Sequence, residues 1–89
     1  MNEEREIRGY VIRVEGRFIS AILANHHPEK PVVYFKDSLE EAKTWQTPST
    51  VRKARARAGR GGMILSYSLD KKGKRVLNGM LAKNGEVSL

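Results

Sequence analysis

The side chains best suited to chemistry in this chain are arginines and lysines, and they gather in two short stretches. An arginine guanidinium can hold a phosphate through two parallel hydrogen bonds, and glycines beside it allow a ligand to approach the backbone closely. The two stretches therefore indicate a surface for an anionic partner. The candidate binding residues are Arg52, Lys53, Arg55, Arg57, Arg60, Lys71, Lys72, Lys74 and Arg75.

The positive charge is confined to one half of the chain. Residues 1–46 hold seven Lys/Arg against eight Asp/Glu, whereas residues 47–89 hold ten against two, so the halves carry net charges of −1 and +8 that sum to the formal +7. No acidic residue occurs between Glu41 and Asp70 to neutralise the first basic stretch. A one-sided basic field of this kind attracts polyanions.

Nucleic acid is the partner that this charge pattern favours. The basic helix carries no Asn or Gln for reading bases, so we expect non-specific binding led by phosphate contacts, and no recognised DNA-binding or RNA-binding motif is present. An alternative of another class is a protein-protein inhibitor or adaptor whose basic surface meets an acidic host protein. A charged, solvent-exposed helix without a partner is the third interpretation.

Catalytic and metal-binding sets are not indicated. Glu40 and Glu41 are neighbours on different sides of a helix and cannot form an acid/base pair, and Gly59-Arg60-Gly61-Gly62 lacks the Lys-Ser/Thr of a phosphate-binding loop. Cysteine is absent, and the two histidines, His26 and His27, are adjacent on a proline-rich loop. We therefore expect a non-enzymatic protein with no cofactor and no metal.

The hydropathy pattern contains neither a signal peptide nor an apolar run of the roughly 18–20 residues that span a bilayer. We expect no membrane contact and a cytoplasmic location. Residues 1–8 are polar and are predicted to be a flexible leader, and residues 9–89 are long enough for a single domain. The oligomeric state is not predicted.

Before the basic stretch, the alternation of apolar and polar residues predicts a three-stranded meander. Two strands are joined by a turn at Glu15-Gly16, and a third is short and rich in β-branched and aromatic residues. The predicted strands are Gly9–Val14, Arg17–Leu23 and Pro31–Lys36.

Two short helices are predicted next. Ser38 and Glu41 fit a capping box, and Leu39, Ala42 and Trp45 then follow at helical spacing. A second helix begins with Thr47 as cap and Pro48 at its first position, and it ends at Gly59. At 100° per residue, Val51, Ala54 and Ala58 form a narrow small-residue face, and most of the cations lie on the opposite side.

The remaining chain predicts further strands, beginning with Met63–Leu69 and a hairpin loop at 70–74 with Gly73 in the left-handed region. Asn78-Gly79 and Asn84-Gly85 are turn signals, and Asn78-Gly79 is either a hairpin turn or a bulge in one long strand. The fold class is therefore α+β: a small antiparallel sheet of four to six strands with two short helices packed on one face, in the order β-β-β-α-α-β-β.

The arrangement of core positions resembles that of short uncharacterised proteins encoded by bacteriophages and prophages. In those proteins a strand-turn-strand leads to an aromatic-x-Asp, a helix containing Ala-Lys-x-aromatic, a second helix with spaced alanines and a closing strand. The matching positions here are Tyr10–Val14, Gly16–Phe18, Phe35-Lys36-Asp37, Glu41-Ala42-Lys43, Trp45, Thr50, Ala54 and Ile64-Leu65. The likeness covers about residues 8–70 and implies a fold and a viral origin, with a bacterial host cytoplasm as the location, and no site.

Overall fold

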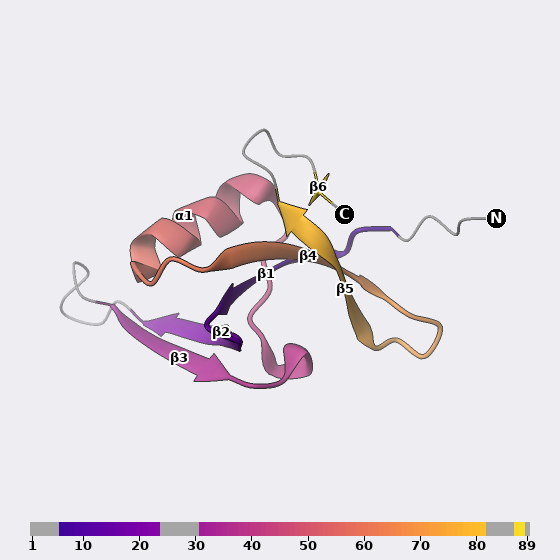
Figure 1. Ribbon diagram of the computed structural model, residues 1–89, viewed down its shortest axis with the longest axis horizontal. Coiled ribbons are helices and arrows are strands. Elements are labelled where there is room, and N and C mark those ends of the chain that lie inside the picture. The colour runs from indigo at the N-terminus through magenta and orange to yellow at the C-terminus, as the bar shows by residue number, and fades with distance from the viewer. Residues whose placement is uncertain (1–5, 24–30, 82–86, 89) are drawn as a thin grey trace.

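The computed structural model describes residues 6–23, 31–81 and 87–88 (Figure 1). Its elements are β1 (Gly9–Val14), β2 (Arg17–Leu23), β3 (Val32–Lys36), the 3-10 turn η1 (Leu39–Glu41), α1 (Pro48–Ala58), β4 (Met63–Leu69), β5 (Arg75–Leu81) and β6 (Val87–Ser88). Together they form a small α+β fold around one antiparallel sheet, which confirms the predicted class.

The strands lie in the order β3-β2-β1-β4-β5-β6, so β1 and β4 are central and the meander β1–β3 forms one half of the sheet. The turn between β1 and β2 is the one predicted, with Glu15 at φ 49 and Gly16 at φ 83. Two successive residues in the left-handed region give the turn a twist that matches that of the flanking strands.

Asn78-Gly79 is a bulge and not a hairpin turn. The β4–β5 register runs from Ser66↔Gly79 directly to Tyr67↔Leu77, so Asn78 has no opposite residue. Its side-chain Nδ2 donates to Ser68 Oγ. The strand therefore continues to Leu81, where it pairs with β6, and the second step, Asn84-Gly85, lies outside the described residues.

The two faces of the sheet carry two separate cores, because successive strand residues point to opposite sides. On one face, Val51 and Ala58 of α1 pack on β-strand residues such as Ile12 and Ile19. On the other face, η1 covers a second cluster. The buried members of that second cluster are Val11, Phe18, Ala42, Leu65 and Tyr67.

The prediction of two helices on one face is wrong in both number and placement. Ser38 does cap the segment by accepting from the Glu40 amide, but helical structure ends after the three residues of η1. Figure 1 shows η1 and α1 on opposite sides of the sheet. Leu39 and Ala42 pack on the second cluster, whereas Trp45 packs on the first, so these three residues do not form one stripe.

The helix predicted after Ser38 stops at η1 because the segment between η1 and α1 is extended and pairs with the sheet. Tyr10 and Trp45 exchange both backbone hydrogen bonds, at 2.8 and 2.9 Å, and the Lys43 amide donates to Ile19 O. Direct β1–β2 pairing is limited to Arg13↔Phe18 and Val14↔Arg17. Residues 43–45 therefore fill the gap where β1 and β2 diverge and carry the chain from one face of the sheet to the other.

Candidate functional site

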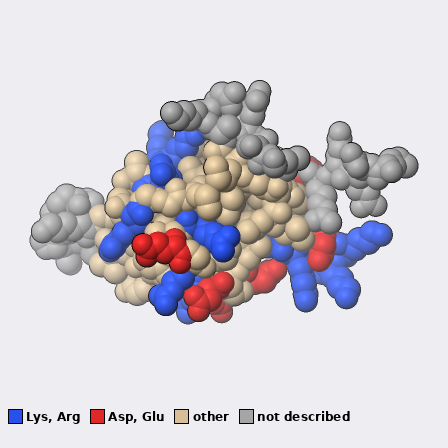
Figure 2. Space-filling model, viewed as in Figure 1, with Lys and Arg blue, Asp and Glu red and all other residues tan. Residues whose placement is uncertain are grey.

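The predicted binding residues divide into two groups at opposite ends of the molecule. α1 lies over one end of the sheet, and the β4–β5 loop projects from the other (Figure 1). The seven residues of β4 separate the two groups by roughly 20 Å at the usual strand rise. Figure 2 shows the same division, with blue side chains over α1 and at the loop and acidic side chains between them. The helix and the hairpin thus do not form one continuous basic surface.

The sequence of α1 fixes where the helix begins and ends. Thr47 accepts from the Thr50 amide while the Thr50 hydroxyl lies within reach of the Thr47 amide, which completes a reciprocal capping box. Pro48 occupies the first turn, and Gly59 ends the helix at φ 65. Val51 and Ala58 are buried and Ala54 is half-buried, which confirms the predicted small-residue face.

The opposite side of α1 presents Lys53 and Arg57, four residues apart, and Arg60 follows three residues later, beyond the end of the helix. All three side chains are exposed, and within the described residues none has an ion-pair or hydrogen-bond partner. Basic residues in the last turn offset the negative end of the helix dipole, which accounts for Arg57 but not for Lys53. The three side chains therefore form a row of positive charges that no carboxylate of the described residues neutralises.

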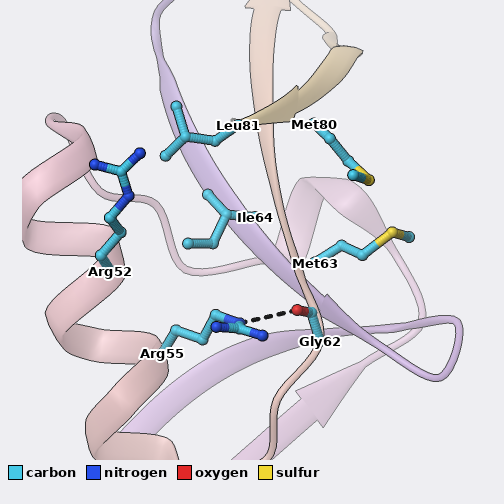
Figure 3. Close-up of a pocket in the computed structure, with 7 residues that line it drawn as sticks. All are labelled: Arg52, Arg55, Gly62, Met63, Ile64, Met80 and Leu81. Carbon is cyan, nitrogen blue, oxygen red and sulfur yellow. Dashed lines mark hydrogen bonds between the residues drawn. The ribbon is translucent and has the colours of Figure 1, made fainter. Parts of the chain in front are cut away.

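The other two helix cations lie toward the sheet. Arg52 is half-buried, and Arg55 Nε donates to Gly62 O at 2.9 Å, which ties the helix to the start of β4. Both residues line an open depression between α1 and the adjoining ends of β4 and β5 (Figure 3). These two arginines therefore differ in environment from the outward row.

The hairpin loop is organised by Asp70. Its carboxylate Oδ1 accepts from the amides of Lys72 and Lys74 at 2.8 and 2.9 Å, and Gly73 takes the predicted left-handed conformation at φ 82. The side chains of Lys71, Lys72 and Lys74 are exposed. They form a compact cationic tip whose backbone is held by the hydrogen bonds to Asp70.

Arg75 is a structural residue. Its Nη1 donates to Leu39 O and to Ala42 O, each at 2.9 Å, and its guanidinium lies 5.4 Å from the centre of the Tyr67 ring. Its amide donates to Glu40 Oε1. These contacts hold η1 on the sheet, so the guanidinium is engaged within the fold and is poorly placed to hold a phosphate.

Sequence reasoning missed the methionines of the depression, Met63 and Met80. They belong to different strands and come together only because the bulge at Asn78 sets the register Leu65↔Met80. They are 44% and 46% exposed, much like Leu69 at 41%, so what marks them is that they line one depression together, which only the structure shows.

Other site types find little support in the part of the chain that the structure describes. Among residues 6–23, 31–81 and 87–88 there is no group of three or more His, Cys, Asp and Glu side chains that could hold a metal ion. No helix in these ranges is long and apolar enough to cross a membrane. His26 and His27 lie outside the described residues.

Comparisons of the chain with protein-family models, with curated proteins and with solved structures found no match.

Proposed function

We propose that the protein is a small, non-enzymatic nucleic-acid-binding protein that docks the outward side of α1 on phosphates. The observation that supports this most directly is the row formed by Lys53, Arg57 and Arg60, exposed and without partners among the described residues. Like charges four residues apart on a helix are mutually destabilising, and an anion placed along the row relieves that repulsion.

The geometry of α1 suits a chain of phosphates better than a single ion. Lys53 and Arg57 are about 6 Å apart along the helix axis, and the row continues past the C-cap to Arg60. Because the small residues of α1 face the sheet, the row lies on the side of the helix that faces away from it. The protein would act in the cytoplasm of its host, where nucleic acid is accessible.

The β4–β5 loop is a second, independent phosphate contact in this proposal. Lys71, Lys72 and Lys74 are exposed, but they lie roughly 20 Å from α1, beyond the far end of β4. A nucleic acid would reach both groups only if it ran along β4 for about six nucleotides at 3.4 Å each. We therefore treat the two groups as separate contacts and assign α1 the principal role.

The test is fluorescence anisotropy with a labelled 20-base-pair duplex between 50 and 300 mM salt. The triple variant Lys53→Gln/Arg57→Gln/Arg60→Gln is compared with Lys71→Gln/Lys72→Gln/Lys74→Gln, which removes the same charge from the loop. Each lost phosphate contact lowers the slope of log K against log salt by about 0.9, so we expect the helix variant to lose about 2 to 3 in slope and the loop variant about 1 or less.

Equal losses in the two variants would indicate attraction to net charge and not to α1. No binding by the folded wild-type protein at 50 mM salt would overturn the proposal. Competition by poly-glutamate as strong as that by the duplex would instead favour the acidic-protein partner, because carboxylate and phosphate chains then serve equally well.

A further inference from the structure

The depression beside α1 combines two arginines with apolar surface. Its volume is about 370 Å³, at the lower end of the range of small-molecule sites. It is lined by Arg52 and Arg55 of α1, Gly62, Met63 and Ile64 at the start of β4, and Met80 and Leu81 at the end of β5. No acidic residue is among them, so the lining is cationic and apolar.

The depression lies where β4 extends beyond β5. The last β4–β5 pair recorded is Leu65↔Met80, so Met63 and Ile64 precede the region of pairing. Figure 3 shows Arg55 reaching from α1 to Gly62, Arg52 running along the helix, Ile64 and Leu81 pointing toward the helix and the two methionines pointing away from it. The guanidinium groups and the thioethers therefore lie on opposite faces of the sheet, and a ligand contacts both only across the edge of β4, beyond its last recorded pair with β5.

The rim of the depression is held rigidly. Arg55 Nε donates to Gly62 O, and a Cβ on Gly62 would lie 2.6 Å from Arg13 O, so the loop sits directly on β1. A guanidinium has five N–H donors, and Nε uses one. The terminal nitrogens of Arg55 have no partner among the described residues and remain available for an acceptor oxygen or nitrogen.

The apolar side of the depression suits a flat, polarisable group. Thioethers are flexible and make favourable contacts with aromatic rings, and both methionines keep almost half of their surface exposed. A ligand with an aromatic face, acceptor atoms at its edge and a phosphate nearby would satisfy both sides. A nucleotide unit has these three features.

We propose that the depression receives an unpaired base of single-stranded nucleic acid whose phosphates lie along α1. A base within a duplex is covered on both faces by its neighbours and has its edge paired, so it cannot enter. Arg52 and Lys53 are consecutive on α1, which connects the depression to the outward row. This inference rests on the proposed function and specifies its ligand as single-stranded.

The test compares four labelled probes of equal length: a thymidine 20-mer, the same strand with abasic sites in place of alternate bases, a guanosine-containing mixed 20-mer and a duplex. The variant is Met63→Ser/Met80→Ser, and the control is Leu69→Ser, which changes an equally exposed residue at the other end of β4. Both variants are checked by circular dichroism and thermal melting.

We expect the wild-type protein to bind the intact strands about tenfold more tightly than the abasic strand, and the methionine variant to bind intact and abasic strands equally. The affinity of the methionine variant for the duplex should stay within about twofold of the wild type. Leu69→Ser should change neither the preference for intact strands nor the affinity for the duplex. Equal losses on strand and duplex, or no preference for bases in the wild type, would overturn the base site. Duplex binding that persists in that case leaves the α1 proposal standing, whereas no binding to any probe removes both.

Discussion

The helix α1 and the β4–β5 hairpin contain the same kinds of side chains, yet the fold uses them differently. Among the described residues, the outward cations of α1 have no internal partner, whereas Arg55 is tied to the chain through Gly62 O. In the hairpin the loop lysines are exposed, but Arg75 donates to two backbone carbonyls of the segment that follows β3. A basic cluster in a sequence can therefore combine residues that are available to a ligand with residues that hold the fold together.

The connections that lead into β4 and β5 also differ in how tightly they are packed. The α1–β4 connection passes against β1 at Gly62, with no room for a side chain, whereas the hairpin turns at Gly73 in open space. Both glycines have positive φ, at 90 and 82. Three predictions test this contrast between a connection packed against the sheet and a loop that only its own hydrogen bonds hold in shape.

The largest effect is expected for Gly62→Ala. The new Cβ would lie 2.6 Å from Arg13 O and 2.7 Å from Val14 Cγ2, in a left-handed conformation, so the strand must shift or the helix must separate from it. We expect a loss of about 3 kcal/mol in the free energy of unfolding, measured by urea titration. Gly73→Ala, which meets no atom within 4 Å, should cost only about 1 kcal/mol. Equal costs would show that backbone conformation alone matters at both positions.

The next largest effect is expected for Arg75→Met, which keeps an unbranched apolar stem over Tyr67 and removes the donors. Leu39 O and Ala42 O then lose their charged partner, and we expect unfolding to become easier by about 2 kcal/mol. Lys74→Met, on the adjacent exposed residue, should change stability by about 0.5 kcal/mol or less. Each variant loses one positive charge, so we expect Arg75→Met and Lys74→Met to bind nucleic acid equally well per folded molecule. A larger loss of affinity for Arg75→Met would place Arg75 in the interface.

The smallest effect is expected for Asp70→Ala. The substitution removes one acceptor that serves the amides of Lys72 and Lys74, both in an exposed loop, so we expect a loss of about 1 kcal/mol, or roughly 4–8 °C in Tm for a domain of this size. Asp70→Asn keeps the side-chain oxygen and should recover most of that loss. Failure of Asn to recover it would mean that the charge of Asp70, and not its hydrogen-bond geometry, stabilises the loop.

The features that the sequence predicted correctly are those decided within four or five residues. Thr47-Pro48 begins α1, Gly59 ends it and Glu15-Gly16 makes a turn, each because the local backbone has one favourable solution. The segment after Ser38 was predicted wrongly because its helical signals are equally local. They are overridden by the pairing of Trp45 with Tyr10, which lies 35 residues earlier in the sequence.

The candidate site shows the same limit. The charge pattern identifies Lys53, Arg57 and Arg60 as candidates because helical spacing alone places them opposite Val51. It cannot distinguish Arg75 from its neighbours, because the carbonyls that bind Arg75 lie 33 and 36 residues away. Nor can it bring Met63 to Met80, since their proximity depends on a bulge that shifts one strand by a single residue.

The crossing of residues 43–45 from one side of the sheet to the other also bears on how the protein folds. Direct pairing of β1 with β2 is restricted to two positions near their turn, and the space beyond is occupied by the amides of Lys43 and Trp45. These backbone hydrogen bonds of β1 and β2 are therefore complete only when this segment is in place, and α1 begins three residues after Trp45. We therefore expect closure of the sheet and docking of the helix to occur in one cooperative step, so that the amides of Tyr10, Lys43 and Trp45 exchange with solvent together in hydrogen-exchange measurements.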